Sequence, residues 1–190
     1  MVRWEPNARD RLGQAAMELY TEHGYEQTTV AEIAGRAGLT ERTFFRHFAD
    51  KREVLFDGSA ALQDAMVGAL VAAPASAAPI EAVSAAVEAA GAVLQERRDH
   101  ALVRQAVIAA NPELQERELI KMARLAAALS AALCERGVTA SVADLAAQAG
   151  IAVFHLSFVA WISAADSPDF PEIVRRTFAE LRSVTAGQTG

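Results

Sequence analysis

The chain contains 190 residues, of which 52% are hydrophobic and 22% are charged, and its formal net charge is −6. This length suits one domain, or a small domain joined to a larger one, and the hydrophobic content excludes an intrinsically disordered protein. Alanine, a strong helix former and a poor strand former, is abundant, so we expect a helical fold. The single cysteine permits neither an internal disulfide nor a Cys-x-x-Cys metal clamp. We therefore expect a reducing, cytoplasmic environment.

No segment of the sequence has the pattern of a targeting or membrane segment. Residues 1–14 are too polar for a signal peptide. The longest apolar stretch, residues 149–165, is interrupted by His155, Ser157 and Ser163. It falls short of the roughly 18 uninterrupted apolar residues of a membrane span. We expect no contact with a membrane.

The charge is unevenly distributed along the chain. Residues 1–52 contain eight Lys/Arg and eight Asp/Glu and are neutral, so residues 53–190 carry the whole net charge of −6. A relatively basic first quarter can accompany an anionic partner, although solvated helix faces give the same distribution.

Apolar periodicity, capping residues and helix breakers predict nine helices and no strand. The first helix follows Pro6 and ends at Gly24, and the second starts with the capping-box pair Thr29 and Glu32. Gly38 suits a left-handed turn before the third helix. The expected ranges from the second helix onward are Thr29–Arg36, Thr40–Phe48, Asp50–Ala73, Ile80–Arg98, His100–Ala110, Pro112–Arg136, Ser141–Ala165 and Pro171–Val184, with Ser167-Pro168-Asp169 as the last break.

The second and third predicted helices have the pattern of a helix-turn-helix motif, two short helices joined by a short turn that contains glycine. Ile33, Phe44 and Phe48 fall on faces that would pack together. In such a motif the second helix enters the DNA major groove, where Arg can bind guanine and Thr can contact thymine. Lys51 follows where a cation could hold a phosphate. The outward positions of the third helix are Glu41, Arg42, Thr43, Phe45, Arg46 and His47.

The same residues have plainer interpretations. Arg42 and Arg46 lie four positions apart and could form a solvated helix face. Glu41 could be a helix-start charge that the helix dipole favours, and His47 could be an ordinary surface histidine. Because short helical pairs are common, the spacing alone leaves these alternatives open beside DNA binding.

The individual residues carry a resemblance to a known family. In the first helix the pattern is Ala15-Ala16-x-x-Leu19-Tyr20-x-x-x-Gly24-Tyr25, and it continues without a gap as Thr28-Thr29-Val30-x-x-Ile33-Ala34-x-x-Ala37-Gly38-Leu39-Thr40-x-x-Thr43-Phe44-Phe45-Arg46-His47-Phe48-x-x-Lys51. This sequence closely resembles the N-terminal domain of tetracycline-repressor (TetR) type transcription regulators. The remaining residues show no family motif, only a helical layout of suitable length.

The resemblance implies an all-α, nine-helix TetR-like fold. A DNA-binding domain is expected at residues 5–52, with its helix-turn-helix at about 29–48, and a ligand-binding and dimerisation domain at 53–190. Phe45 stands where the family usually has Tyr, whose hydroxyl bonds a phosphate; Phe cannot make this bond but could pack against a sugar or a thymine methyl. The implied DNA contacts, with Thr29 and Lys51 matching phosphate contacts, are Thr29, Thr40, Glu41, Arg42, Thr43, Phe45, Arg46, His47 and Lys51.

Residues 142–165 are apolar nearly all round when wound as a helix, so this helix must be buried on every side. One stripe can face the chain's own core and the other a second subunit, as the family resemblance also implies. The alternative is a central core helix of a monomer. The expected dimer interface, which includes the final helix, consists of Leu156, Phe158, Val159, Phe170, Val174 and Phe178.

The resemblance further implies a small-molecule effector of unknown identity. The fourth predicted helix would span roughly 35 Å and link the effector to the DNA. His100 and Arg104 are the expected polar anchors, whereas the apolar residues could equally be ordinary core. The residues expected to line the site are Leu62, Met66, His100, Val103, Arg104, Val107, Met122 and Phe154.

We therefore expect a homodimeric DNA-binding regulator, a repressor that binds a palindromic operator in double-stranded DNA and is released by a small effector. An activator, or a regulator that responds to a protein partner, is the alternative on the same fold. An enzyme is disfavoured, because the four histidines are scattered, Cys134 has no histidine at helical spacing, and no phosphate-binding glycine loop occurs. We expect neither a cofactor nor a metal.

Overall fold

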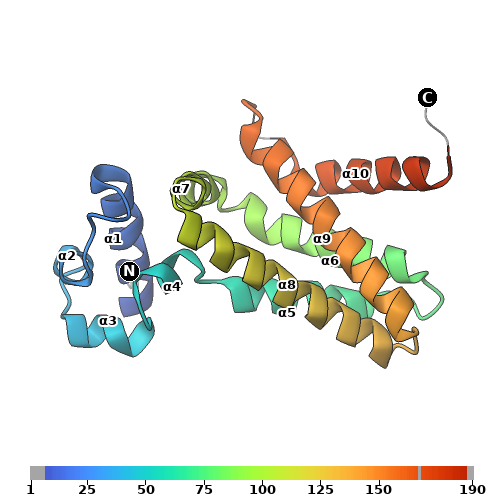
Figure 1. The fold of residues 1–190 in the computed structure, drawn as a ribbon, viewed down its shortest axis with the longest axis horizontal. Helices are drawn as coiled ribbons and strands as arrows, with labels where there is room; N and C mark the ends of the chain where they lie inside the picture. The colour runs from blue at the N-terminus through green and yellow to red at the C-terminus, as the bar shows by residue number, and fades with distance from the viewer. Residues whose placement is uncertain (1–6, 167, 188–190) are drawn as a thin grey trace, which may run out of the picture. The chain divides into compact units, whose positions relative to one another are not determined.

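The computed structural model describes residues 7–166 and 168–187, and these residues form ten α-helices and no strand (Figure 1). The all-α prediction is confirmed, but the expected count of nine helices is corrected to ten. Pro6 and Ser167, predicted to start the first helix and to belong to the last break, lie outside the described residues. The helices are α1 (Ala8–His23), α2 (Val30–Arg36), α3 (Glu41–His47), α4 (Lys51–Leu55), α5 (Ser59–Ala72), α6 (Pro79–Gln95), α7 (Arg98–Ala109), α8 (Pro112–Glu135), α9 (Ala140–Ser163) and α10 (Phe170–Thr185).

The extra helix arises because the predicted long fourth helix is broken. Gly58 adopts φ +85°, a left-handed conformation that an α-helix cannot contain. Asp57 precedes it, and the Asp57 carboxylate accepts hydrogen bonds from the Gly58 backbone N–H at 3.1 Å and from Arg9 at 2.8 Å. The expected continuous helix from Asp50 to Ala73 is therefore wrong, and so is the rigid 35 Å link drawn from it.

The chain divides into two compact units. Unit 1 comprises residues 1–58 and 99–117, and unit 2 comprises residues 59–98 and 118–190. Unit 1 thus contains α1 to α4, nearly all of α7 and the first residues of α8. It differs from the DNA-binding domain expected at residues 5–52, because a segment from the middle of the chain joins it.

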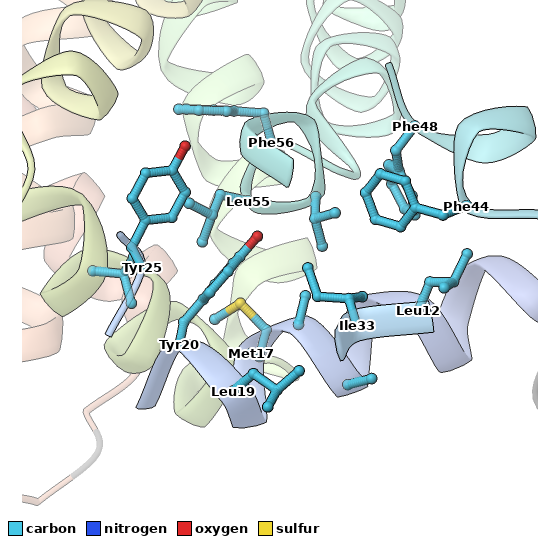
Figure 2. Close-up of a cluster of buried hydrophobic side chains, with 14 of the residues drawn as sticks. Leu12, Met17, Leu19, Tyr20, Tyr25, Ile33, Phe44, Phe48, Leu55 and Phe56 are labelled. Carbon is cyan, nitrogen blue, oxygen red and sulfur yellow. The ribbon is translucent and has the colours of Figure 1, made fainter. Parts of the chain in front are cut away.

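The core of unit 1 is one cluster of buried apolar side chains (Figure 2). Leu12 of α1, Ile33 of α2 and Phe44 of α3 are fully buried in it. Ile108 and Leu114, from α7 and α8, belong to the same cluster. Each such side chain contributes about 1.5–3 kcal/mol when it leaves water. This shared core holds α1 and the two helices of the predicted motif, α2 and α3, at fixed angles.

Unit 2 is built around α6, which packs against α5, α9 and α10. Small residues allow this close packing. An added Cβ at Gly150 of α9 would collide with Val83 of α6, and one at Gly91 would lie 3.3 Å from the backbone of Pro171. The abundance of alanine serves the same purpose, because short side chains let helix axes approach one another.

By length and composition, α9 could cross a membrane, contrary to what the interrupted stretch at residues 149–165 predicted. In unit 2, however, one side of α9 packs against α6 and α10. Core helices of folded domains have the same composition.

Candidate nucleic-acid interface

The first helix of the predicted motif, α2, begins at a capping box. The Thr29 hydroxyl accepts a hydrogen bond from the Glu32 backbone N–H at 3.2 Å, and the Glu32 carboxylate accepts one from the Thr29 backbone N–H at 2.8 Å. Hydrogen bonds from the backbone and then the hydroxyl of Thr29 hold the pKa of Glu32 below its ordinary value. Thr29 is exposed, so its hydroxyl lies at the surface where α2 starts.

The turn between α2 and α3 requires glycine for two reasons. Gly38 has φ +65°, in the left-handed region, and the following Leu39 N–H donates to the Ala34 carbonyl at 2.8 Å. Arg11 of α1 donates to the neighbouring Ala37 carbonyl, and a Cβ at position 38 would lie 2.9 Å from the Arg11 guanidinium. The turn is thus held against α1.

Helix α3 is held by one face and presents the other. The Thr40 hydroxyl accepts from the Thr43 backbone N–H at 3.2 Å and caps the helix. Phe44 and Phe48 are buried with their ring centroids 5.5 Å apart. Thr43 is half-buried. The exposed side presents Thr40, Glu41, Arg42, Phe45 and Arg46, so most of the predicted outward residues share one surface.

His47 is placed differently from the prediction. Its side chain is half-buried, and its Nε2 atom is buried without a hydrogen-bond partner among the described residues. Its carbonyl oxygen accepts from Arg9 at 3.3 Å. His47 therefore lies at the edge of the α3 surface and does not point outward from it.

The cations around α3 fall into two groups. Arg36 binds Glu22 at 2.7 Å, Arg52 binds Asp50 at 2.6 Å, and Arg9 binds Asp57. The hydrogen bond with Glu22 raises the pKa of Arg36, and the same contact lowers that of Glu22. Within the described part of the chain, Arg42 and Arg46 form no ion pair. Both lie on the exposed side of α3, where no carboxylate of the described residues neutralises their charge.

Lys51 makes contacts that the sequence did not predict. Its ammonium donates to the carbonyl oxygens of Tyr25, Glu26 and Thr28 at 2.8, 3.3 and 3.0 Å, and it lies 4.3 Å from the centroid of the Tyr25 ring. A lysine ammonium has three N–H donors. All three are used to hold the loop between α1 and α2, so in this conformation none remains for the expected phosphate contact.

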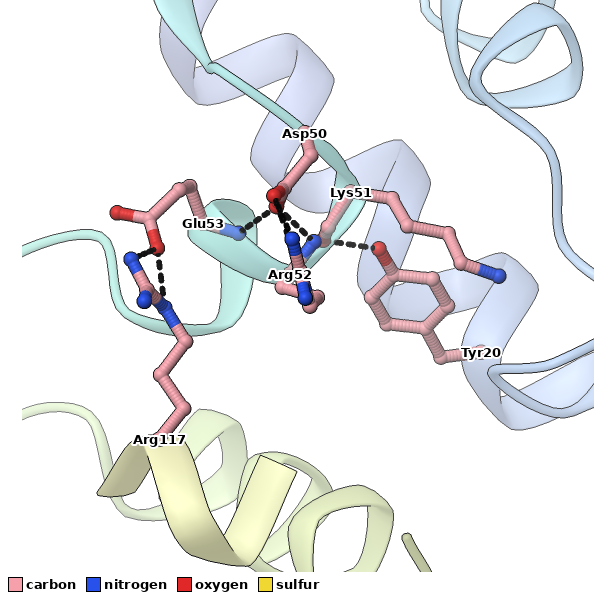
Figure 3. Close-up of polar contacts among 6 residues, drawn as sticks. All are labelled: Tyr20, Asp50, Lys51, Arg52, Glu53 and Arg117. Atoms are coloured by element: carbon pink, nitrogen blue, oxygen red, sulfur yellow. Dashed lines mark hydrogen bonds and ion pairs between the residues drawn. The ribbon is translucent and has the colours of Figure 1, made fainter. Parts of the chain in front are cut away.

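The same region anchors the start of α4 (Figure 3). The Tyr20 hydroxyl donates to the Lys51 carbonyl at 2.6 Å, and burial raises the pKa of Tyr20. The Asp50 carboxylate caps α4 by accepting from the backbone N–H groups of Arg52 and Glu53. Burial acts to raise the pKa of Asp50, but its bonds from Arg52 and Glu53 outweigh this effect and lower it.

Two contacts that sequence reasoning missed hold α7 and the first turns of α8 inside unit 1. Arg117 of α8 pairs with the Glu53 carboxylate of α4 (Figure 3). Arg104 of α7 donates to the Leu55 carbonyl at 2.7 Å and lies 5.1 Å from the Phe56 ring centroid. Arg104 was expected to anchor an effector, and the structure gives it a structural contact instead. The only sequence signal for these contacts is a pair of basic residues at unremarkable positions.

The residues expected to line an effector site are divided between the two units. His100, Val103, Arg104 and Val107 belong to unit 1, whereas Leu62, Met66, Met122 and Phe154 belong to unit 2. Val103 and Val107 line an open groove of about 460 Å³ in unit 1, opposite Tyr20 and Tyr25. The predicted set is therefore not one cluster within either unit.

The predicted dimer residues also separate into two groups. Leu156 and Val159 of α9 are 60% and 40% exposed, and so remain open to a partner. Phe170, Val174 and Phe178 are fully or almost fully buried within unit 2. Phe158 is half-buried; its ring stacks on that of Phe154 and lies tilted against those of Trp161 and Phe170. For Phe170, Val174 and Phe178 the prediction is corrected, because they fill the chain's own core, whereas for Phe158 it stays a prediction. The remaining exposed apolar residues of α9 are Val142 and Leu145.

Comparison with known proteins bears on this surface directly. The family model described as "Bacterial regulatory proteins, tetR family" matches residues 13–57, which include α2, α3 and α4. The HTH-type transcriptional regulator TcmR of Streptomyces glaucescens is 44% identical over 81 residues. That match covers 43% of this chain and 36% of TcmR, so it spans about a third of the length of that relative.

Solved structures resemble the chain over nearly its whole length. The TetR-family transcriptional regulator PfmR from Thermus thermophilus is 26% identical, covers 91% of this chain and 98% of its own, and has a TM-score of 0.53. FadR of Thermus thermophilus, a TetR-family repressor solved with lauroyl-CoA, is 24% identical and has a TM-score of 0.58. The match covers 96% of this chain and 95% of FadR. The likeness to FadR is one of fold.

Proposed function

Because the chain belongs to the TetR family of transcriptional regulators, we propose that it is a repressor that binds a palindromic operator as a homodimer and leaves it when a small effector binds. It is a regulator and not an enzyme. The observation that carries the proposal is the exposed side of α3, where Arg42 and Arg46 stand without a carboxylate partner among the described residues.

The electrostatics of this surface support DNA as the partner. The chain as a whole is acidic, so most Lys and Arg side chains on its surface can pair with a carboxylate of the same chain. Two arginines on one short helix, with no carboxylate partner in residues 7–166 and 168–187, are suited to guanine edges and phosphates. The Thr40 hydroxyl lies at the start of α3, where it can donate to a phosphate that flanks a groove.

Homodimerisation is supported by the exposed apolar side of α9. Val142, Leu145, Leu156 and Val159 lie between 40% and 73% exposed, and the spacing of three residues within each pair places them along one stripe. Two copies of this stripe related by a two-fold axis would cover each other. A two-fold dimer would also present two copies of α3 to the two halves of a palindrome.

A small effector is the third part of the proposal. The T. thermophilus FadR relative was solved with lauroyl-CoA, which supports a small-molecule ligand on this fold and leaves its chemistry here open. A compound that releases the DNA must bind the free protein more tightly than the DNA complex. By linkage, operator DNA lowers the affinity for the compound by the same factor by which the compound lowers the affinity for the DNA. Calorimetric titration of that compound with and without operator measures the factor, and equal affinities would contradict an effector-driven release.

The test of DNA binding uses the full-length protein and the DNA that flanks its own gene. We expect a specific gel shift that survives excess random DNA, and we expect it to disappear when Arg42 and Arg46 are both replaced by Ala. Joint replacement of Arg36 and Arg52 by Ala is the matched control, since it also removes two positive charges, but from residues already paired with Glu22 and Asp50. Absence of any specific complex, or equal loss in the control, would contradict the proposal.

A further inference from the structure

Phe45 has an exposure that the packing of unit 1 does not explain. It is 55% exposed, and among the described residues of unit 1 it is the only large apolar side chain left exposed. Its ring lies edge-on to the buried Phe44, with centroids 5.5 Å apart and an interplanar angle of 84°. A ring held in this way has a defined direction and an open face. A partner that covered this face would gain free energy by removing apolar surface from water.

The place of Phe45 on α3 indicates what that partner touches. At 3.6 residues per turn, Phe45 and Arg42 occupy the middle of the exposed arc of α3, with Glu41 on one side and Arg46 on the other. When a recognition helix lies in the major groove, the middle of its exposed arc faces the base edges and the flanks face the two backbones. Phe45 therefore faces bases.

The chemistry of the ring then selects one kind of base. A phenyl side chain has neither a donor nor an acceptor, so it cannot bond a phosphate or the polar edge of a base. The apolar group that the major groove offers is the C5-methyl group of thymine, and Phe is suited to contact it. We propose that Phe45 reads a thymine methyl in each half-site of the operator, beside the base pair that Arg42 contacts. The inference rests on the proposed DNA-binding function and adds a base preference to it.

The test removes the methyl group alone. Full-length protein first selects its preferred duplex from a pool of random sequences, and each thymine of that duplex is then replaced by deoxyuridine, which pairs identically but lacks the methyl. We expect that one thymine position in each half-site is sensitive. Replacement of a single thymine at that position should raise the dissociation constant about fourfold, the change that corresponds to burial of one methyl-sized group. Phe45→Ala should bind the original duplex more weakly and should lose the sensitivity to uracil at that position.

Two further variants identify the residue responsible. Thr43→Ser removes the other methyl group near this surface and should leave the uracil effect unchanged, and Phe45→Tyr keeps the ring and should retain it. Two results would overturn the inference while leaving DNA binding intact. One is a selected duplex without thymine in its half-sites. The other is an affinity that no uracil replacement changes, which is the result expected if the Phe45 ring packs on deoxyribose. An equal uracil effect in wild type and Phe45→Ala also overturns it. Failure to select any duplex overturns the proposed function itself.

Discussion

At the scale of single residues, the charged groups of unit 1 divide by what they already bind. Arg42 and Arg46 are exposed and form no ion pair within the described part of the chain, whereas the Lys51 ammonium is surrounded by three carbonyl oxygens and a tyrosine ring. Burial, together with a hydrogen bond to Glu113, raises the pKa of Tyr25, so this ring stays neutral beneath the ammonium. Lys51 is thus a positioning residue, which sets the loop that leads into the Thr29 cap of α2.

Replacement of Lys51 by Met should therefore affect DNA binding through the loop. The free energy of unfolding should fall by about 1–2 kcal/mol, because loop carbonyls lose a charged donor, and affinity should fall for specific and random DNA alike. The slope of log K against log salt should stay at the wild-type value, whereas Arg46→Ala should flatten it by about one unit if Arg46 contacts a phosphate. Urea unfolding and anisotropy titrations at several salt concentrations measure both. A flatter slope for Lys51→Met would mean that the ammonium leaves the loop for a phosphate.

At the scale of elements, arginines stabilise helix ends that the backbone leaves open. The last carbonyls of a helix have no partner within it. Arg136 donates to the carbonyls of Leu70, Val71 and Ala73 at the end of α5, and to that of Pro74 at 2.7 Å. Arg98 donates to carbonyls at the end of α9 and lies 5.9 Å from the Trp161 ring centroid. Each contact joins helices that are far apart in the sequence.

Replacement of Arg136 by Ala should consequently weaken unit 2. We expect a loss of about 1–3 kcal/mol, since hydrogen bonds from a charged donor to half-buried carbonyls are lost together. Arg176→Ala is the control, because Arg176 is exposed and meets Glu180 only at 4.0 Å, so its loss should cost less than about 0.5 kcal/mol. Equal unfolding midpoints for the two variants in urea would show that the Arg136 contacts contribute nothing.

At the scale of the whole molecule, the proposed dimer depends on the apolar side of α9 that stays exposed in a single chain. The stripe of Val142, Leu145, Leu156 and Val159 runs along α9 and is completed by small residues between its ends. An exposed apolar stripe of this kind marks an interaction site in a folded protein. Phe170 and Phe178 of α10, which were expected at the interface, lie instead buried inside unit 2, where α10 packs against α9.

The wild-type chain should therefore have twice its 20.2 kDa mass in light scattering at micromolar concentration. Val159→Glu should give folded monomers, because a charge on the stripe would be desolvated in the dimer. Val71→Glu makes the same change at a residue of α5 that is 55% exposed, and it should leave the dimer intact. A wild-type monomer, or a dimer that tolerates glutamate at position 159, would exclude this interface.

The helix-turn-helix could be predicted from the sequence because its determinants are local. Three of them act within a few residues: the Thr29–Glu32 capping box, the left-handed Gly38 and the Thr40 cap. The apolar side chains of α2 and α3 pack against each other and against α1, the preceding helix. The break at Asp57-Gly58 also had a local signal, since this dipeptide is a turn former. Apolar periodicity on both sides of it predicted a continuous helix, and the positive φ at Gly58 overrode that prediction.

Features that depend on contacts between distant segments were decided by the tertiary structure alone. Periodicity indicates that a helix has an apolar face but not which segment covers it. It therefore could not place Ile108 and Leu114 in the core of unit 1, or assign Phe170 and Phe178 to the interior while leaving Leu156 exposed. Lys51 illustrates the same limit for polar groups, because its sequence position matches a phosphate contact while its ammonium is occupied by carbonyls that fold back from the α1–α2 loop. Local sequence determined the shape of the DNA-reading motif, and long-range packing determined which side chains remained free to act.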